Sequence, residues 1–430
     1  MSLDLPFLIF ILGFAAILIL RVPIALGMLA TSVFYFLAAG IDPALMAEKV
    51  LTNLFSAFII IAVPLFVFTA KVMNTSKVSD MIYSFAHAMV GKVRGGLGHV
   101  NVIGSLIFSG MTGSAVADAS GVGILEVTQM RKHGYDAGFS CAVTVTSATI
   151  GPVFPPSIPM IFYAMLSGAS IGALFMGGML PGLLMSAALM VYIAYISNKR
   201  KYPMGDPFIL RKFLHATFIA LPALLTPVIL LGGIYSGFVT PTEAGALAAF
   251  YAIVISMLVY RSLGARQLWE VIVDTAKTTG VLSLIVGSAY AFSFIVAKEQ
   301  IPQAVGEVML GITDNKYVLL LIINIVFLIL GMFIDTSTIM LVFIPMVLPL
   351  VKALGIDLTH FGVMIVLNMM IGLTTPPFGV LLFIVSGITK VPLQEIIKDT
   401  LPLIGALIVV LFLITYIPEI VLFLPNTFLK

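Results

Sequence analysis

Long apolar runs follow one another along almost the whole chain, and they restrict its fold more than any other feature. One run covers residues 401–424, another covers 365–388, and a third covers 318–351 with Asp335 as its only charged residue. About 20 apolar residues suffice for a helix to cross the hydrocarbon core of a bilayer. Only 10% of the residues are charged, against about 25% in soluble domains. We therefore predict an all-α polytopic membrane protein embedded in a lipid bilayer.

A motif that recurs at a fixed distance divides the chain into two halves. IGPVFPP begins at Ile150 and IGLTTPP begins at Ile371, an offset of 221 residues. The same offset relates three further pairs, namely Gly110-Met111 and Gly331-Met332, Gly134 and Gly355, and Leu180-Pro181 and Leu401-Pro402. Matches that keep one register over such a distance indicate an internal duplication.

The most basic stretch of the chain lies between the two halves. It contains the basic residues Lys199, Arg200, Lys201, Arg211 and Lys212. Because positive charge accumulates in cytoplasmic loops, we expect a first repeat over residues 1–200, a cytoplasmic linker over 201–212 and a second repeat over 213–430. We expect the repeats to be inverted, since inverted repeats with interrupted helices are typical of secondary transporters.

Two kinds of interruption recur in each half. The first is a run of small and polar residues, 109–123 and 331–338, inside an apolar stretch. Glycine permits unusual backbone angles, and Ser, Thr and Asp favour caps and turns, so each run suits the tip of a re-entrant helical hairpin. The second is a double proline, which predicts unwound regions at 150–156 and 371–377 because proline removes a donor and clashes with the preceding turn.

Acidic residues within the broken segments predict cation sites. An intramembrane carboxylate indicates a functional site, and sodium binds carboxylates, hydroxyls and carbonyls freed at broken helices. We predict two sodium sites, one formed by Thr112, Ser114, Asp118 and Gly151, the other by Gly331, Met332, Asp335, Gly372, Thr374 and Thr375. The alternative is that the Ser, Thr and Asp side chains only cap the hairpin helices.

An anionic solute fits between the two hairpin tips, because the N-termini of half-helices attract anions. The candidate contacts are Ser114, Ser157, Asp335, Thr375 and Lys298. Two of them have other interpretations. Ser157 suits a helix cap, and Lys298 suits a helix-end lysine whose amine reaches the membrane interface.

Motifs that the chain lacks exclude several functional classes. There is no GxxxxGK[ST] loop of an ATP-driven pump and no His-Glu-x-x-His motif of an intramembrane protease. Cys141 is the only cysteine, and the net charge of +3 does not indicate nucleic-acid binding. We expect no enzyme. A channel is less consistent with a duplication that carries paired hairpins, which favours alternating access.

The broken segments resemble those of a known family. The runs SGMTGSAVADASGVG, TSATIGPVFPPSIPMI, GFVTPTEAGALAA, GMFIDTSTIMLVFIPMVLPL and IGLTTPPFGVLLFIVSG are similar to the large membrane subunit, M or DctM-type, of TRAP (tripartite ATP-independent periplasmic) transporters. The resemblance covers essentially the whole chain and places the two hairpin tips at 109–123 and 331–345.

This resemblance implies a mechanism and partners. Such subunits lie in the bacterial inner membrane, work with a small four-helix membrane subunit and a periplasmic solute-binding protein, and import organic anions with two or more Na+ ions. Their fold is that of the ion-transporter superfamily, in which a mobile domain moves as an elevator. The chain looks most similar to sialic-acid members, with C4-dicarboxylate members next. The alternative is a stand-alone sodium/divalent-anion symporter without a binding protein.

Overall fold

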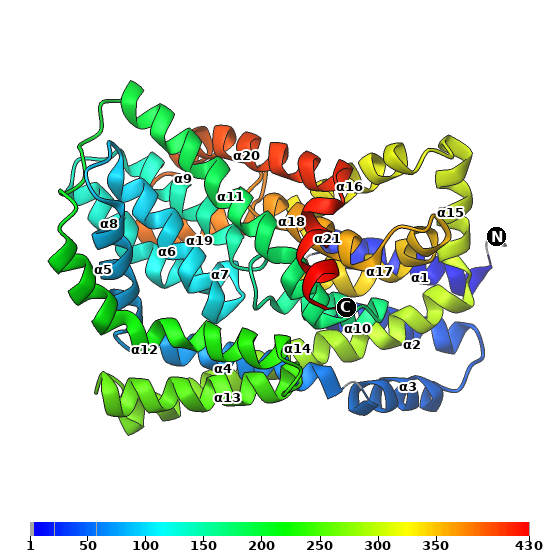
Figure 1. Ribbon diagram of the computed structural model, residues 1–430. Helices are drawn as coiled ribbons and strands as arrows, with labels where there is room; N and C mark the ends of the chain where they lie inside the picture. Colours follow the sequence, from blue (N-terminus) through cyan, green and yellow to red (C-terminus); the bar gives the residue numbers. More distant parts are fainter. Residues whose placement is uncertain (1–3, 21, 57, 430) are drawn as a thin grey trace.

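The computed structural model describes residues 4–20, 22–56 and 58–429, which form helices joined by short connections (Figure 1). The first half contains α1 (Leu5–Leu20), α2 (Ile24–Ala38), α3 (Pro43–Ser56), η1 (Phe58–Ile61), α4 (Ala62–Thr75), α5 (Val78–Val90), α6 (Gly96–Thr112), α7 (Ala115–Ser120), α8 (Val122–Lys132), α9 (Ala137–Ser147), η2 (Ala148–Ile150), α10 (Ile158–Ser167) and α11 (Ile171–Lys199). The second half contains α12 (Leu210–Tyr235), α13 (Pro241–Val254), η3 (Ile255–Val259), α14 (Ala265–Lys298), α15 (Ile301–Ile312), α16 (Lys316–Phe333), α17 (Thr336–Ala353), α18 (Leu358–Gly372), α19 (Val380–Thr389), α20 (Leu393–Tyr416) and α21 (Glu419–Phe428).

The length and surface of the helices confirm an all-α polytopic membrane protein. Eight helices in the described part of the chain are long and apolar enough to cross a membrane. Large apolar side chains such as Phe218, Phe250 and Val191 are exposed on their outer faces. A soluble protein would rarely expose so much contiguous apolar surface, whereas lipid tails solvate it.

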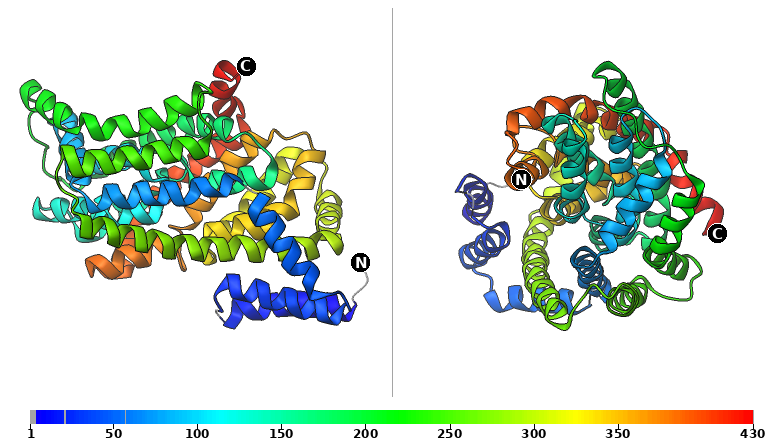
Figure 2. Two further views of the ribbon diagram at one scale, coloured as in Figure 1. Left: turned by 90° about the horizontal axis from the view of Figure 1, so that it is seen from below. Right: turned by 90° about the vertical axis from the view of Figure 1, so that its left-hand side faces the viewer.

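The helices form two packed groups. In the first, α4, α12 and α13 lie side by side along the lower edge of Figure 1, and α14 packs on α2, α3 and α4. In the second, α9 packs on α20, α11 packs on α6 and α20, and α16 packs on α18. The N-terminal helices, dark blue in Figure 2, and α21, red, lie on different sides of the bundle in both views.

The predicted linker is anchored at its start by charged residues from both halves. Arg200 donates to Asp136, which precedes α9, at 3.1 Å, and also forms an ion pair with Asp399 of α20. The hydroxyl of Tyr202 donates to Asp136 at 2.6 Å. Burial and this hydrogen bond raise the pKa of Tyr202. These contacts tie the link between the halves to α9 and α20.

Each hairpin breaks at a short turn within the predicted tip. In the first, α6 ends at Thr112, Gly113 adopts a left-handed conformation (φ 59°), and Ser114 caps α7. In the second, α16 ends at Phe333 and Asp335 caps α17. A left-handed residue ends a helix at little cost when it is glycine, and Ser and Asp satisfy the free N–H groups of the helix that follows.

Two irregular segments, one after η2 and one after α18, each contain a double proline. Both Pro-Pro peptide bonds are cis. The first irregular segment follows η2 and covers residues 151–157. The second covers 373–379, because α18 continues through Ile371 and Gly372. The predicted range 371–377 therefore begins two residues too early, since the Leu373 N–H still donates to the Met369 carbonyl at 3.0 Å.

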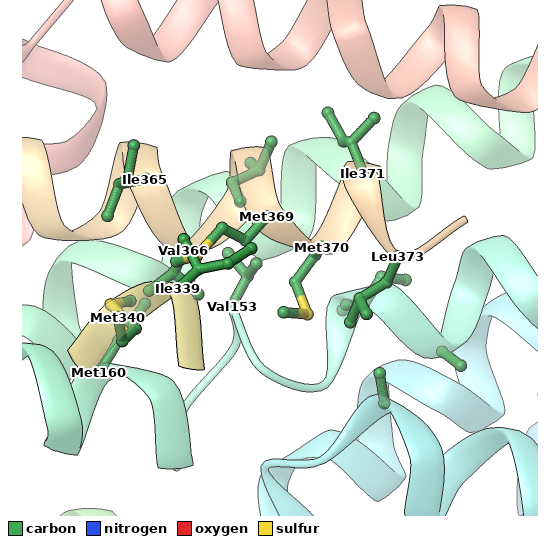
Figure 3. Packing of buried hydrophobic residues seen from close by; sticks show 14 of the residues in the cluster. Val153, Met160, Ile339, Met340, Ile365, Val366, Met369, Met370, Ile371 and Leu373 are labelled. Carbon is green, nitrogen blue, oxygen red and sulfur yellow. The ribbon is translucent and has the colours of Figure 1, made fainter. Parts of the chain in front are cut away.

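Apolar packing fixes the first irregular segment in place. Val153 is fully buried, and Figure 3 shows it beside Ile339 of α17 and Val366 of α18. Met160 of α10 and Met370 of α18 belong to the same core cluster and are also buried. Methionine adapts to the uneven gaps between a loop and two helices. The core thus positions the first irregular segment against α17 and α18.

Candidate functional site

The first hairpin turn lies directly against the first irregular segment. A Cβ on Gly113 would stand 2.5 Å from the Pro156 carbonyl oxygen, so only glycine permits this approach. A Cβ on Gly151 would stand 3.6 Å from the Ser114 carbonyl carbon. Thr112 is buried at the end of α6, where its hydroxyl donates to the Phe108 carbonyl at 3.4 Å. The structure therefore brings Thr112, Ser114 and Gly151 together.

The second hairpin turn contacts the second irregular segment in the same way. A Cβ on Gly372 would stand 2.7 Å from Gly331 Cα. The Gly379 N–H donates to the Met332 carbonyl at 3.3 Å. The hydroxyls of Thr374 and Thr375 donate to the Ile371 carbonyl at 2.8 and 2.7 Å, which leaves their oxygen lone pairs available to a cation. Gly331, Met332, Gly372, Thr374 and Thr375 are therefore neighbours.

The two acids of the predicted sodium sites have different surroundings. Asp335 caps α17, since its oxygens accept from the Thr338 N–H at 3.1 Å and from the Thr338 hydroxyl at 2.5 Å. This contact agrees with the alternative prediction that Asp335 caps a hairpin helix, although the Asp335 side chain remains exposed. Asp118 is fully buried on α7, and neither carboxylate oxygen has a hydrogen-bond partner. Capping therefore accounts for Asp335 but not for Asp118.

A cavity of about 270 Å³ lies where the two hairpin turns meet. Ser114 and Val116 line it from the first turn, and Asp335 and Ser337 line it from the second. Its other lining residues include Pro152, Pro159, Met370 and Leu373 from the segments behind the turns, and Val67, Thr278 and Leu282 from α4 and α14. The cavity thus lies between the hairpins and the first group of helices.

Two of the five predicted solute contacts, Ser114 and Asp335, line this cavity. The other three make different contacts. Ser157 caps α10 by accepting from the Met160 N–H at 3.2 Å, and its own hydroxyl donates to the Pro152 carbonyl. The Thr375 hydroxyl donates within its own segment, and the Lys298 ammonium lies 5.4 Å from the centre of the Tyr35 ring.

Two buried or half-buried charged residues, Lys71 and Glu126, are not among the site residues predicted from the sequence. Lys71 of α4 forms an ion pair with Asp274 of α14 at 2.5 Å and donates to the Thr278 hydroxyl, a cavity residue, at 2.6 Å. The sequence does indicate a role for Lys71, because it is a charged residue within an apolar run. Glu126 of α8 is 1% exposed with no hydrogen-bond partner for either oxygen. In the sequence Glu126 stands shortly before a charged stretch, and its neighbours in the sequence do not indicate that it is buried.

Comparisons with known proteins agree with this architecture. Residues 11–420 match the family "Tripartite ATP-independent periplasmic transporter, DctM component". The sialic acid TRAP transporter large permease protein SiaM of Vibrio cholerae is 40% identical over 97% of this chain and 98% of its own length. The C4-dicarboxylate TRAP transporter large permease protein DctM of Pseudomonas aeruginosa is 38% identical over 86% of each chain.

A solved structure shares the fold at low sequence identity. The YdaH transporter of Alcanivorax borkumensis superimposes with a TM-score of 0.62 at 13% identity, over 87% of this chain and 88% of its own. The family assignment makes this chain a multi-pass protein of the bacterial inner membrane and a transporter, not an enzyme. The chain belongs to the DctM-component family of tripartite ATP-independent periplasmic transporters.

Proposed function

We propose that this chain is the large membrane subunit of a sodium-coupled importer of an organic anion. The observation that carries the proposal is the cavity at which two hairpin turns meet, each supported by an irregular segment. Transporters use such broken helices to hold ions and solute near mid-membrane. A periplasmic solute-binding protein delivers the solute, and a small four-helix membrane subunit completes the system, as the tripartite family implies.

The proposed sodium sites lie on either side of this cavity. The first consists of Thr112, Ser114, Asp118 and Gly151, and the second of Gly331, Met332, Asp335, Gly372, Thr374 and Thr375. The close glycine contacts at both turns support them, because backbone carbonyls approach there without side chains between them. The two sites differ in the surroundings of their carboxylates, since Asp118 is buried without a hydrogen-bond partner and Asp335 also caps a helix.

The proposed solute is an organic anion, with sialic acid first and a C4-dicarboxylate second, in line with the substrates named for the two relatives. The cavity lies at the N-terminus of α17, where Thr336 and Ser337 line it. A helix N-terminus attracts negative charge. Lys71, which forms an ion pair with Asp274, places an ammonium group next to Thr278. The helix N-terminus and this ammonium group support an anion as the solute.

We propose alternating access by an elevator movement of two inverted repeats, 1–200 and 213–430. The helix bounds support the repeats. α7 and α8 together cover Ala115–Lys132, and α17 covers Thr336–Ala353, an offset of 221 residues at both ends. The position of the cavity supports the movement, because the hairpins face α4 and α14 across it. If the hairpins slide along these two helices, the solute moves with them.

Uptake by the complete transporter in liposomes tests the proposed function. Radiolabelled sialic acid, with the cognate binding protein outside, should enter only under an inward sodium gradient. Potassium in place of sodium should reduce uptake to the background of protein-free liposomes. Uptake that persists without sodium would contradict the coupling. Sodium-driven uptake in the absence of binding protein would instead favour a stand-alone symporter.

Lys71→Ala should raise the KM for an anionic solute about tenfold, equivalent to about 1.4 kcal/mol, with little change in the maximal rate. The reason is that Lys71 donates to Thr278, which faces the cavity, and that its removal leaves the Asp274 carboxylate without its ion-pair partner, so the charge beside the cavity becomes more negative and repels an anion. Uptake as a function of solute concentration at saturating sodium measures the effect. Lys77→Ala is the control, because Lys77 is an exposed lysine at the start of α5, just after the helix of Lys71. An unchanged KM would exclude Lys71 from solute recognition.

A further inference from the structure

Glu126 is a buried carboxylate that the proposed sodium sites do not use. Glu126 and Asp118 are 1% and 0% exposed. Of the acidic residues in the described part of the chain, these two alone have both carboxylate oxygens buried without a hydrogen-bond partner. None of the ion pairs found there includes either residue. Because an unpaired ionised carboxylate in an interior is strongly destabilising, each acid must either hold a proton or bind a cation.

The two acids, Asp118 of α7 and Glu126 of α8, both lie against α6. Glu126 Oε1 is 2.4 Å from the position that a Cβ on Gly104 would occupy, so Glu126 lies directly against α6. Gly123, which lies between the acids in sequence, is in close contact with the Thr144 methyl group of α9. The Ser105 hydroxyl, on the residue that follows Gly104, lies close enough to interact with Asp118. Two buried carboxylates therefore lie against neighbouring residues of α6.

The polar groups near the two carboxylates are rich in oxygen and poor in free donors. Asn101 donates to the Thr144 hydroxyl at 2.7 Å, the Ser147 hydroxyl donates to the Asn101 carbonyl oxygen at 2.7 Å, and the Ser105 hydroxyl donates to Ser147 at 3.0 Å. All four side chains are buried. The hydrogens of Ser105 and Ser147 are used within this chain of bonds, and none of the four groups forms a hydrogen bond to the carboxylates, although Ser105 lies close enough to act on Asp118. A hard cation prefers such a set of oxygens.

The second half of the chain shows that a hairpin helix can be built without these acids. The positions 221 residues after Asp118 and Glu126 are Ile339 and Val347 of α17, which are 0% and 8% exposed. Apolar side chains thus fill the equivalent places in a helix of the same extent. Packing alone therefore does not require carboxylates at Asp118 and Glu126.

We propose that Glu126 and Asp118 together bind one sodium ion, with Glu126 as a second carboxylate ligand in the first half of the chain. The described residues contain no group of three His, Cys, Asp or Glu side chains that could hold a transition metal, whereas two carboxylates near hydroxyl oxygens suit an alkali cation. The inference rests on the proposed sodium coupling and adds a ligand to it. It also makes the first site more negative than the second.

Equilibrium binding of ²²Na+ to the purified membrane complex tests this inference. Glu126→Gln keeps the size of the side chain and removes its charge. Glu126→Val introduces the residue type found at position 347 and carries the test if the Gln variant does not fold. Both variants should raise the half-saturating sodium concentration of one site about tenfold or more. Glu307→Gln, at an exposed position on α15, should bind sodium like the unmodified protein.

The outcomes separate this inference from the proposed function. Unchanged sodium affinity and stoichiometry in folded Glu126→Gln or Glu126→Val would overturn Glu126 as a ligand. If Asp118→Asn loses sodium in the same assay, the sodium coupling stands without Glu126. If the unmodified complex binds no sodium, both the coupling and this inference are wrong. Elution as a single peak in size-exclusion chromatography and an unchanged melting temperature in potassium identify variants that are folded.

Discussion

Asp118→Ala should strongly reduce sodium-driven uptake while the protein still folds and inserts into the membrane. The carboxylate is fully buried, and its oxygens accept no hydrogen bond, so the substitution removes charge without breaking a hydrogen bond. The ligands that remain at the first turn, Ser114, Thr112 and the Gly151 carbonyl, are neutral, and only the proposed ligand Glu126 would still supply a negative charge. Loss of a charged partner costs about 1.5–3 kcal/mol, which corresponds to roughly 10- to 150-fold in sodium affinity.

Uptake at saturating solute, measured over a range of sodium concentrations in proteoliposomes, shows the effect as a rightward shift or a complete loss. Asp80→Ala is the matched control, because Asp80 is an exposed carboxylate in the first turn of α5. It should respond to sodium like the unmodified protein. If Asp118→Ala also shows a normal sodium response, Asp118 is not a sodium ligand. A drop in melting temperature in potassium would point to a structural role instead.

The breaks in the helices could be predicted from the sequence because their causes are local. Gly113 takes a backbone conformation that other residues avoid, and Ser114 and Asp335 are N-caps, so residue type alone places both turns. The start of α13 could be predicted for the same reason, from Thr240 and Glu243. Their reciprocal capping box, evident in the run TPTEAG, is present at the start of α13.

The partners of individual polar side chains could not be predicted, since tertiary packing decides them. A serine after a double proline can face a cavity or turn back on its own loop, and Ser157 donates to Pro152. Lys298 lies over Tyr35 of α2, which is far away in sequence. Glu126 precedes a basic flank and looks solvated, and only its approach to Gly104 on α6 shows that it is buried.

Gly372→Ala should disrupt the second sodium site more severely than any other change of similar size. A Cβ on Gly372 would stand 2.7 Å from Cα and 2.8 Å from the carbonyl carbon of Gly331. These are backbone atoms, so no rotamer change relieves the clash, and the second hairpin turn must move away from α18. The carbonyl of Met332 would then separate from the Gly379 N–H that it accepts from. Overpacking of this kind costs about 1–3 kcal/mol.

Sodium-dependent uptake by Gly372→Ala should therefore fall to background, and its melting temperature should no longer rise with added sodium as far as that of the unmodified protein. Gly387→Ala is the control, since Gly387 lies in α19 and a Cβ there meets no atom within 4 Å. Alanine in a helix is favoured over glycine by about 1 kcal/mol, so this variant should be equally active and slightly more stable. Normal uptake by Gly372→Ala would show that the two segments separate during transport and that their close contact does not hold sodium.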